Sequence, residues 1–316
     1  MNQIKQKPKK VTKKQQFFTF SVVVLISLIV TGLALCAMFA INQQAERNNA
    51  PFTEQPMWVQ DFSSSKNTSI DPTVWRYSTN PNIPGYNNEK QAYTSNAQNI
   101  RIEPNTGLII EAHKGKYRYP NDPQSRMFEY TSGRIDTQHS FNFSYGKVEA
   151  TIMLPKGRGV WPAFWLLSAN EPYTSKLDSD NTTRPDERFY MKDGEIDIME
   201  YYGDPGGHVE GTLHTYARSH ENRVTVSDYA EKFHTYAVEI EPTKVTWTVD
   251  DKPYFTYSKT SKNTDEWPIG SDNQFYIILN LAMGGTGGGE IDDTAAPWQM
   301  VVKNVKFYDY VGHNPY

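Results

Sequence analysis

Three acidic residues lie close together in a segment whose other residues favour a β-strand. The segment from Asp193 to Gly203 reads DGEIDIMEYYG, and its central acids are Glu195, Asp197 and Glu200. Isoleucine, methionine and tyrosine fill most of the other positions and turn-forming residues flank the run, so we predict a short strand. Because carboxylates are unfavourable inside strands, the cluster indicates a chemical function.

The spacing of the acids can place two carboxyl groups on one face of this strand. Side chains alternate along a strand, so Glu195 and Asp197 share a face while Glu200 would point the other way. A one-residue bulge near Ile198-Met199 would return Glu200 to the same face. The two glutamate Cα atoms would then be roughly 13 Å apart, and their carboxyl groups could approach to roughly 5 Å, as in a retaining glycosidase.

Two carboxyl groups at that separation can cleave a glycosidic bond. Three clustered carboxyl groups cannot all ionise easily, so at least one pKa should be raised, and a protonated Glu200 could donate its proton to the leaving group. We therefore assign Glu195 as the nucleophile, Glu200 as the acid/base and Asp197 as the group that balances the protons. Spacing alone leaves the order of these roles open. The alternatives are an exposed acidic strand face and a metal site that combines the acids with His208 or His214.

The composition points away from nucleic acid as a partner. The net charge of the 316-residue chain is −4, which gives no basic footprint for phosphates. The 20 tyrosines, 15 phenylalanines and 7 tryptophans are better suited to an uncharged ligand. Cys36 is the only cysteine, so no intramolecular disulfide can form.

From Trp58 onward the chain alternates apolar and polar residues in short runs that are separated by turn-forming residues. In KVEATIML, for example, alternate residues share one face: Val148, Ala150, Ile152 and Leu154. VDDKPYF predicts a hairpin with Asp250-Asp251 in the turn. Many short strands predict an all-β sandwich or barrel, and we treat residues 58–316 as one domain. Residues 169–194 form a long polar loop, which is typical of a functional or mobile segment.

The N-terminal residues predict a membrane anchor. Residues 1–16 contain six lysines and no acid, and residues 17–41 contain no charge. At about 1.5 Å per residue, a helix of that length exceeds a hydrocarbon core of roughly 30 Å. The lysines should stay cytoplasmic, which places the later residues outside the cytoplasmic membrane, in the periplasm or the extracellular space. Residues 42–57 are a polar linker. The alternative is a signal segment that is cleaved to release a secreted protein.

Several segments together resemble a known family. GYNNEKQAYT, GEIDIMEYYG, HVEGTLH and FYIILNLAMGGTGGG follow one another in the order found in glycoside hydrolase family 16, and the similarity extends from Trp58 to Tyr310. It is closest to the laminarinase-like bacterial β-glucanases with the bulged E-x-D-x-x-E motif. The resemblance implies a β-jelly roll of two stacked antiparallel sheets with a concave substrate cleft. It also implies a retaining endo-hydrolase with Glu195 as nucleophile and Glu200 as acid/base. The extra residue Met199, which mixed-linkage lichenases and plant transglycosylases of the family usually lack, favours β-1,3-glucan, with agar or carrageenan as the nearest alternatives.

The resemblance also implies residues that bind the substrate. They are Trp161, Trp165, Arg134, Asn88 and His214. The alternatives are core packing for the two tryptophans, a structural ion pair for the arginine, loop capping for the asparagine and a partner elsewhere for the histidine. As partner we expect a polysaccharide, bound by a monomer.

Two departures from the family pattern concern a loop and a metal. In GGTGGG, Gly287 stands where the family commonly has a tryptophan, so one stacking platform is missing. A structural calcium site of some relatives would need acids where this chain has Asp61 and Lys303, and the lysine is unsuitable. We therefore expect no metal and no cofactor. A non-catalytic glycan-binding module and a transglycosylase are the remaining alternatives.

The predicted anchor can be tested on the exported protein. We expect mass spectrometry to find residues 1–41 still attached, because Met38-Phe39-Ala40 is a poor cleavage site for signal peptidase. A mature N-terminus near Ile41, or a lipid on Cys36, would rule the anchor out.

Overall fold

The computed structural model describes residues 31–33, 35, 37, 38, 51–79, 86–122, 124–169, 193–260 and 265–312. The predicted tail 1–16, most of the predicted anchor 17–41 and most of the linker 42–57 lie outside these residues. Residues 170–192 of the predicted polar loop also lie outside them. Within the described part of the chain, no helix is both long enough and apolar enough to cross a membrane.

Ten strands form the larger of two sheets. They are β1 (Trp58–Asp61), β3 (Gln91–Tyr93), β4 (Ile100–Glu103), β5 (Gly107–Tyr117), β6 (Phe128–Ser132), β9 (Gly146–Met153), β14 (His234–Glu241), β15 (Lys244–Val249), β16 (Lys252–Ser258) and β18 (Trp298–Asp309). Their order is β16-β15-β14-β9-β18-β5-β6-β3, with β1 beside β18 and β4 beside β5. The pairing is antiparallel except between β3 and β6.

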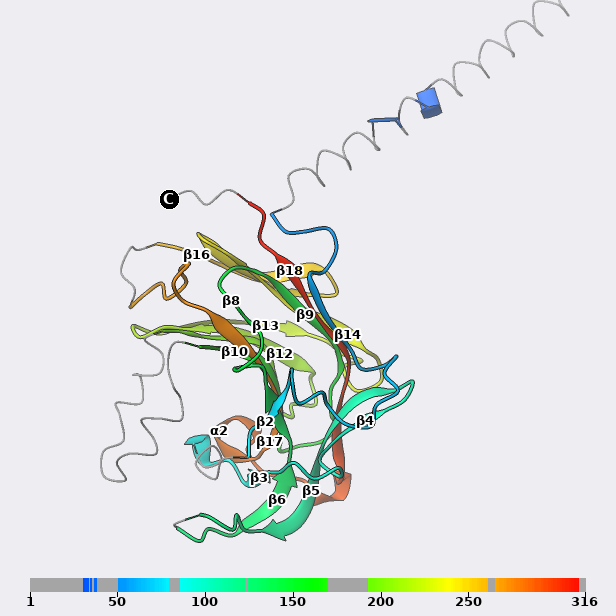
Figure 1. Ribbon diagram of the computed structural model, residues 1–316, viewed down its shortest axis with the longest axis vertical. Helices are drawn as coiled ribbons and strands as arrows, with labels where there is room; N and C mark the ends of the chain where they lie inside the picture. The colour runs from blue at the N-terminus through cyan, green and yellow to red at the C-terminus, as the bar shows by residue number, and fades with distance from the viewer. Residues whose placement is uncertain are drawn as a thin grey trace, which may run out of the picture.

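Eight strands form the smaller sheet, which lies against the larger one (Figure 1). They are β2 (Arg76–Tyr77), β7 (Arg134–Asp136), β8 (Asn142–Phe143), β10 (Val160–Ser168), β11 (Glu195–Tyr201), β12 (His208–His214), β13 (Ser219–Thr225) and β17 (Phe275–Met283). Their order is β13-β12-β11-β10-β17-β7-β2, with β8 beside β17. Short helical turns are η1 (Tyr86–Asn88), α2 (Gly285–Gly288) and η3 (Asp293–Ala295).

One continuous apolar core joins the two sheets. The side chains that the alternation in β9 placed on one face are buried in this core: Val148, Ala150, Ile152 and Leu154. Core residues of the smaller sheet come from the inner face of β11 and its neighbours, including Ile196 and Tyr201. β9 thus buries one face in the core, whereas β17 is buried on both faces and contributes Tyr276 and Ile278 to a separate apolar cluster. The prediction of an all-β protein with two sheets is confirmed.

The strand β11 contains the predicted bulge. Three steps along β11, from Asp197 to Glu200, oppose only two steps along β12, and the pairing with β10 shifts at the same place. The consecutive residues Ile198 and Met199 both point into the core, with 1% and 0% of their surface exposed. One residue of β11 is therefore extra, and Glu200 is returned to the face that carries Asp197.

A tryptophan from the larger sheet holds this bulge. Trp247 of β15 is buried in the core, and its Nε1 donates to the carbonyl oxygen of Asp197 at 2.8 Å. Gly211 of β12 leaves the room for its ring, because a Cβ at this position would lie 2.5 Å from a ring carbon of Trp247. The irregular backbone of β11 is thus tied to the opposite sheet by a buried hydrogen bond.

Trp247→Phe should destabilise the domain by more than the loss of apolar volume explains. The substitution leaves the Asp197 carbonyl without this donor, which should add about 1–3 kcal/mol to the loss of unfolding free energy. Denaturant unfolding monitored by circular dichroism measures this loss. Trp298→Phe is the matched control, because Trp298 is equally buried and its Nε1 has no hydrogen-bond partner among the described residues. Equal losses in the two variants would contradict a role of the hydrogen bond.

Candidate active site

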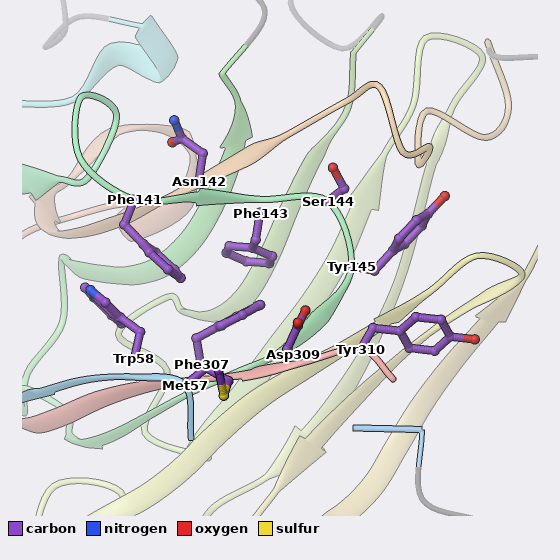
Figure 2. Close-up of a pocket in the computed structure, with 10 residues that line it drawn as sticks. All are labelled: Met57, Trp58, Phe141, Asn142, Phe143, Ser144, Tyr145, Phe307, Asp309 and Tyr310. Carbon is purple, nitrogen blue, oxygen red and sulfur yellow. The ribbon is translucent and has the colours of Figure 1, made fainter. Parts of the chain in front are cut away.

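A hollow in the described part of the domain does not contain the three acids. It has a volume of about 430 Å³ and lies where β1, the segment around β8 and the end of β18 meet (Figure 2). Trp58 and Phe141 stack in its wall with their ring centres 4.4 Å apart, and Phe307 packs in the core beneath. Its shape is that of a gap at the margin of the core. The arrangement of titratable groups, and not the size of a hollow, therefore locates the candidate site.

The three acids lie on the outer face of β11, opposite the core. Asp197 is buried, with 3% of its surface exposed, while Glu195 and Glu200 are partly exposed. A bulge in this strand was expected to place all three acids on one face. A partly exposed carboxyl group on each side of a buried one can meet a ligand that lies along the strand.

Asp197 is paired with His214 of the neighbouring strand β12. The Nε2 atom of His214 lies 2.9 Å from Oδ2 of Asp197, and its Nδ1 lies 2.6 Å from Oγ of Ser219. Burial acts to lower the pKa of His214, but the bond to Asp197 and the nearby glutamates overcome it and raise the pKa to about 10. His214 is therefore an imidazolium at neutral pH, placed beside the acids as expected.

Glu195 has positive charges as neighbours. Its Oε1 atom lies 3.7 Å from Nε2 of His214. Burial raises the pKa of Glu195, and repulsion by Asp197 raises it further. The charges of His214 and Arg134 act in the opposite direction, and the resulting pKa is about 8.

Glu200 has neutral hydrogen-bond donors as neighbours. Nε1 of Trp161 donates to Oε1 at 2.7 Å, and the hydroxyl of Tyr202 lies 2.8 Å from Oε2. Burial raises the pKa of Glu200, and repulsion by Asp197 contributes, so that the pKa is about 8. The two glutamates are thus similarly buried, but Glu195 has cationic neighbours and Glu200 has neutral ones.

The same groups have the donor set of a metal site. Ligand atoms of Glu195, Asp197 and His214 all lie within 4.8 Å of one another. A metal would require the neutral imidazole as ligand, whereas the pKa of His214 is raised to about 10. His208, the other histidine considered, lies at the far end of β12 and bonds to Asp204. His214 would therefore have to lose its proton before it could bind a metal beside Glu195 and Asp197.

Trp165 and Arg134 belong to a polar network beside the acids. The guanidinium carbon of Arg134 lies 4.8 Å from the centre of the Trp165 ring, and Nε1 of Trp165 donates to Asn280 at 2.6 Å. Asn280 in turn donates to the hydroxyl of Tyr93 at 3.1 Å. Glu89 lies within reach of the Arg134 charge, and burial raises its pKa. One face of Trp165 is thus covered by Arg134, and only the rest of the ring can meet a ligand.

Trp161 is held from two sides. Besides its bond to Glu200, its indole lies against the backbone of Gly287 in α2, where a Cβ would come within 2.5 Å of two ring carbons. The missing side chain at this position is therefore a requirement of the packing around Trp161. Asn88 is exposed in η1, which lies against α2.

Sequence reasoning missed two polar groups next to Glu200. Tyr202 is two residues after Glu200, an even step that keeps it on the same face of the chain. Glu210 is directly opposite Glu200 in the β11–β12 pairing and is an even number of positions from His214. Its carboxylate pairs with Arg223 of β13. The even spacing within HVEGTLH was the available signal.

Asp61 and Lys303, at the positions compared with the calcium site of some relatives, have other partners. The carboxylate of Asp61 accepts hydrogen bonds from Ser63 and Ser64 and closes the turn after β1. The ammonium group of Lys303 lies 4.0 Å from the ring centre of Phe233.

Known proteins share both the sequence and the fold of this chain. The model of Glycosyl hydrolases family 16 matches residues 87–299. A β-glucanase from Rhodothermus marinus is 32% identical over 300 residues, which cover 90% of this chain and 94% of that protein. The endo-β-1,3-glucanase structure from Pyrococcus furiosus is 32% identical, with a TM-score of 0.68 over 84% of this chain and 100% of that chain. SCLam, a non-specific endo-β-1,3(4)-glucanase, is 32% identical, with a TM-score of 0.69 over 85% and 98%. The resemblance expected from the motifs is confirmed, and this chain belongs to Glycosyl hydrolases family 16 and is a glycoside hydrolase.

Proposed function

We propose that this chain is a retaining endo-glycosidase that hydrolyses β-1,3-glucan, with Glu195 as nucleophile and Glu200 as acid/base. The observation that carries the proposal is the unequal surroundings of two glutamates on one face of one strand. A retaining enzyme needs one ionised and one protonated carboxyl group at the same pH. Different neighbours around two otherwise similar groups supply that difference.

Glu195 is the glutamate that ionises first. Two buried carboxyl groups that repel each other cannot both lose their protons at the same pH. The cations His214 and Arg134 stabilise the charge on Glu195. Once Glu195 is ionised, its charge raises the pKa of Glu200 further. Glu200 therefore keeps its proton while Glu195 carries the negative charge.

The reaction follows from these protonation states. A carboxylate oxygen of Glu195 attacks the anomeric carbon, while the proton of Glu200 passes to the leaving oxygen, which takes the electron pair of the broken bond. Glu200, now ionised, removes a proton from water, and the water oxygen displaces Glu195 from the anomeric carbon. The imidazolium of His214, fixed by Asp197, balances the charge on Glu195 before the first step and again after the second, when Glu195 is a free carboxylate.

The polysaccharide we propose is β-1,3-glucan because the bulged motif contains Met199 and because two of the relatives named above are a β-glucanase and an endo-β-1,3-glucanase. Trp161 offers an indole at the acid/base and can stack on a sugar ring. Gly287 adds no side chain on its side of the ring, so aromatic contact there comes from Trp161 alone. Arg134 can reach sugar hydroxyls next to Glu195, and Asn88 can do so from the rim.

The N-terminal pattern places this activity outside the cytoplasmic membrane in our proposal. A segment at residues 17–41 would hold the domain close to the cell surface, where polysaccharides of high mass are accessible. The proposal of an anchor rests on the sequence pattern alone and is checked by the mass of the exported protein.

A panel of defined polysaccharides tests the proposed activity on the full chain. We expect new reducing ends from laminarin at a higher rate than from mixed-linkage glucan, agarose or carrageenan. Proton NMR of the first product should show the anomer that the substrate had, because two displacements restore the configuration. Products longer than the substrate at high acceptor concentration would indicate transglycosylation. Binding without products across the whole panel would contradict the assignment and favour a glycan-binding module.

The two glutamate roles are separable by substitution. Glu200→Gln should lower kcat about 10²- to 10⁴-fold, which is the usual contribution of a general acid. Glu195→Gln should remove turnover because no covalent intermediate can form. With an activated substrate, azide should restore turnover in Glu200→Ala with retention and in Glu195→Ala with inversion. Glu149→Gln, which removes a buried carboxylate from the larger sheet, is the control. The opposite pairing of azide products would reverse the two roles.

A further inference from the structure

The hydroxyl of Tyr202 lies between two carboxyl groups. Its oxygen is 2.8 Å from Oε2 of Glu200 and 2.7 Å from Oε1 of Glu210. A hydroxyl has one hydrogen and can donate to only one acceptor at a time. If both glutamates were ionised, one of these two contacts would join oxygens without a proton between them. The three groups must therefore share two protons if both contacts are to be hydrogen bonds.

Glu210 is the group that is held as a carboxylate. Its Oε2 atom is in an ion pair with Nε of Arg223, and Glu210 has 8% of its surface exposed. An arginine is always charged, so the paired oxygen accepts and does not carry a proton. The hydrogen of Tyr202 then points to Oε1 of Glu210.

The oxygen of Tyr202 is then free to accept from Glu200. Trp161 already donates to Oε1 of Glu200, so a proton on this glutamate resides on Oε2, the atom that faces Tyr202. With that proton in place, each contact in the series of side chains Trp161, Glu200, Tyr202, Glu210 and Arg223 contains one hydrogen atom. Without it, the hydroxyl can satisfy only one of its two carboxylates.

We propose that Tyr202 is a positioning residue whose hydroxyl switches between Glu210 and Glu200 as the acid/base changes protonation during turnover. The inference rests on the proposed function of Glu200. When Glu200 gives its proton to the leaving oxygen, the hydroxyl turns from Glu210 to the new carboxylate. When Glu200 takes a proton from water, the hydroxyl turns back. Tyr202 itself neither gains nor loses a proton, and burial together with the two carboxylates raises its pKa.

Other charged groups face this chain from neighbouring elements. Asp197 and Glu195 lie on β11, and His214 lies on β12, as described above. The guanidinium of Arg223 on β13 also lies 5.7 Å from the ring centre of Tyr202. Tyr254 of β16 approaches Glu210 from the larger sheet, and burial raises its pKa, so it stays neutral. None of these groups supplies a second hydrogen to the contact between Tyr202 and Glu210.

Whether the Tyr202 hydroxyl accepts from Glu200 or donates to it decides the direction in which Tyr202→Phe shifts the pKa of Glu200. When Glu200 is protonated, the hydroxyl of Tyr202 makes two hydrogen bonds: it donates to Glu210 and accepts from Glu200. When Glu200 is ionised, the hydroxyl makes only one of these two bonds. Tyr202→Phe therefore destabilises the protonated form more and should lower the pKa of Glu200. A hydroxyl that only donated to Glu200 would have the opposite effect, because its removal would destabilise the carboxylate.

The test is the pH profile of kcat/KM, whose basic limb reports the acid/base of the free enzyme. In Tyr202→Phe we expect this limb to move to lower pH by about half to one pH unit, as one lost hydrogen bond implies. Tyr308→Phe is the matched control, since Tyr308 donates to Glu149 in the larger sheet at 3.0 Å, and should leave the limb in place. A limb that stays or moves to higher pH in Tyr202→Phe overturns the inference.

A second variant, Glu210→Gln, tests the same hydrogen bonds from the Glu210 side. It also keeps the inference testable if Tyr202→Phe folds poorly. In Glu210→Gln the amide can donate to the Tyr202 oxygen, so that the hydroxyl serves Glu200 alone, and the basic limb should again move to lower pH. An unchanged limb in Glu210→Gln also contradicts the inference. Failure of the proposed function would appear differently, as absence of hydrolysis in the unsubstituted chain or as retained activity in Glu200→Gln.

Discussion

The site depends on one irregularity in the backbone of β11. A regular strand would point Glu200 into the core, where an unpaired carboxyl group is costly. The bulge at Ile198 and Met199 turns two consecutive apolar side chains inward and brings Glu200 out beside Asp197. Trp247 ties this distortion to the opposite sheet through the Asp197 carbonyl. The carbonyl group of Asp197 thus links the packing of the two sheets to the placement of the acids.

Charge around the three acids is distributed unevenly, and this gives otherwise similar groups different roles. The cation His214 lies beside Glu195 and Asp197, while the hydrogen-bond partners of Glu200 are the neutral groups of Trp161 and Tyr202. Burial strengthens both effects because it removes the water that would screen them. A nucleophile and an acid can therefore stand on one strand without a metal between them in the proposed mechanism.

Local patterns in the sequence predicted the features that depend on one strand or one turn. The period of β9, the bulge in β11 and the hairpin turn at Asp250-Asp251, where both residues have positive φ, follow from neighbouring residues alone. Trp161 was expected near the site from the resemblance, whereas the other neighbours of Glu200 were not predicted. Glu210 and Arg223 approach it only through the pairing of three strands, and Trp247 comes from the other sheet. Gly287 was predicted only to lack a stacking side chain, and its close contact with Trp161 could not be predicted because the contacts between facing loops do not follow from sequence spacing.

Arg223 extends the site to the margin of the molecule. It lies on β13, the last strand of the smaller sheet, and 60% of its side chain is exposed. Dissolved ions screen an exposed charge far more than a buried one. Salt in the surroundings can therefore weaken the hold of Arg223 on Glu210, and through the tyrosine its effect can extend to the proton of Glu200. An enzyme built in this way would respond to the salinity of its medium through a series of side chains that ends at its proposed acid/base.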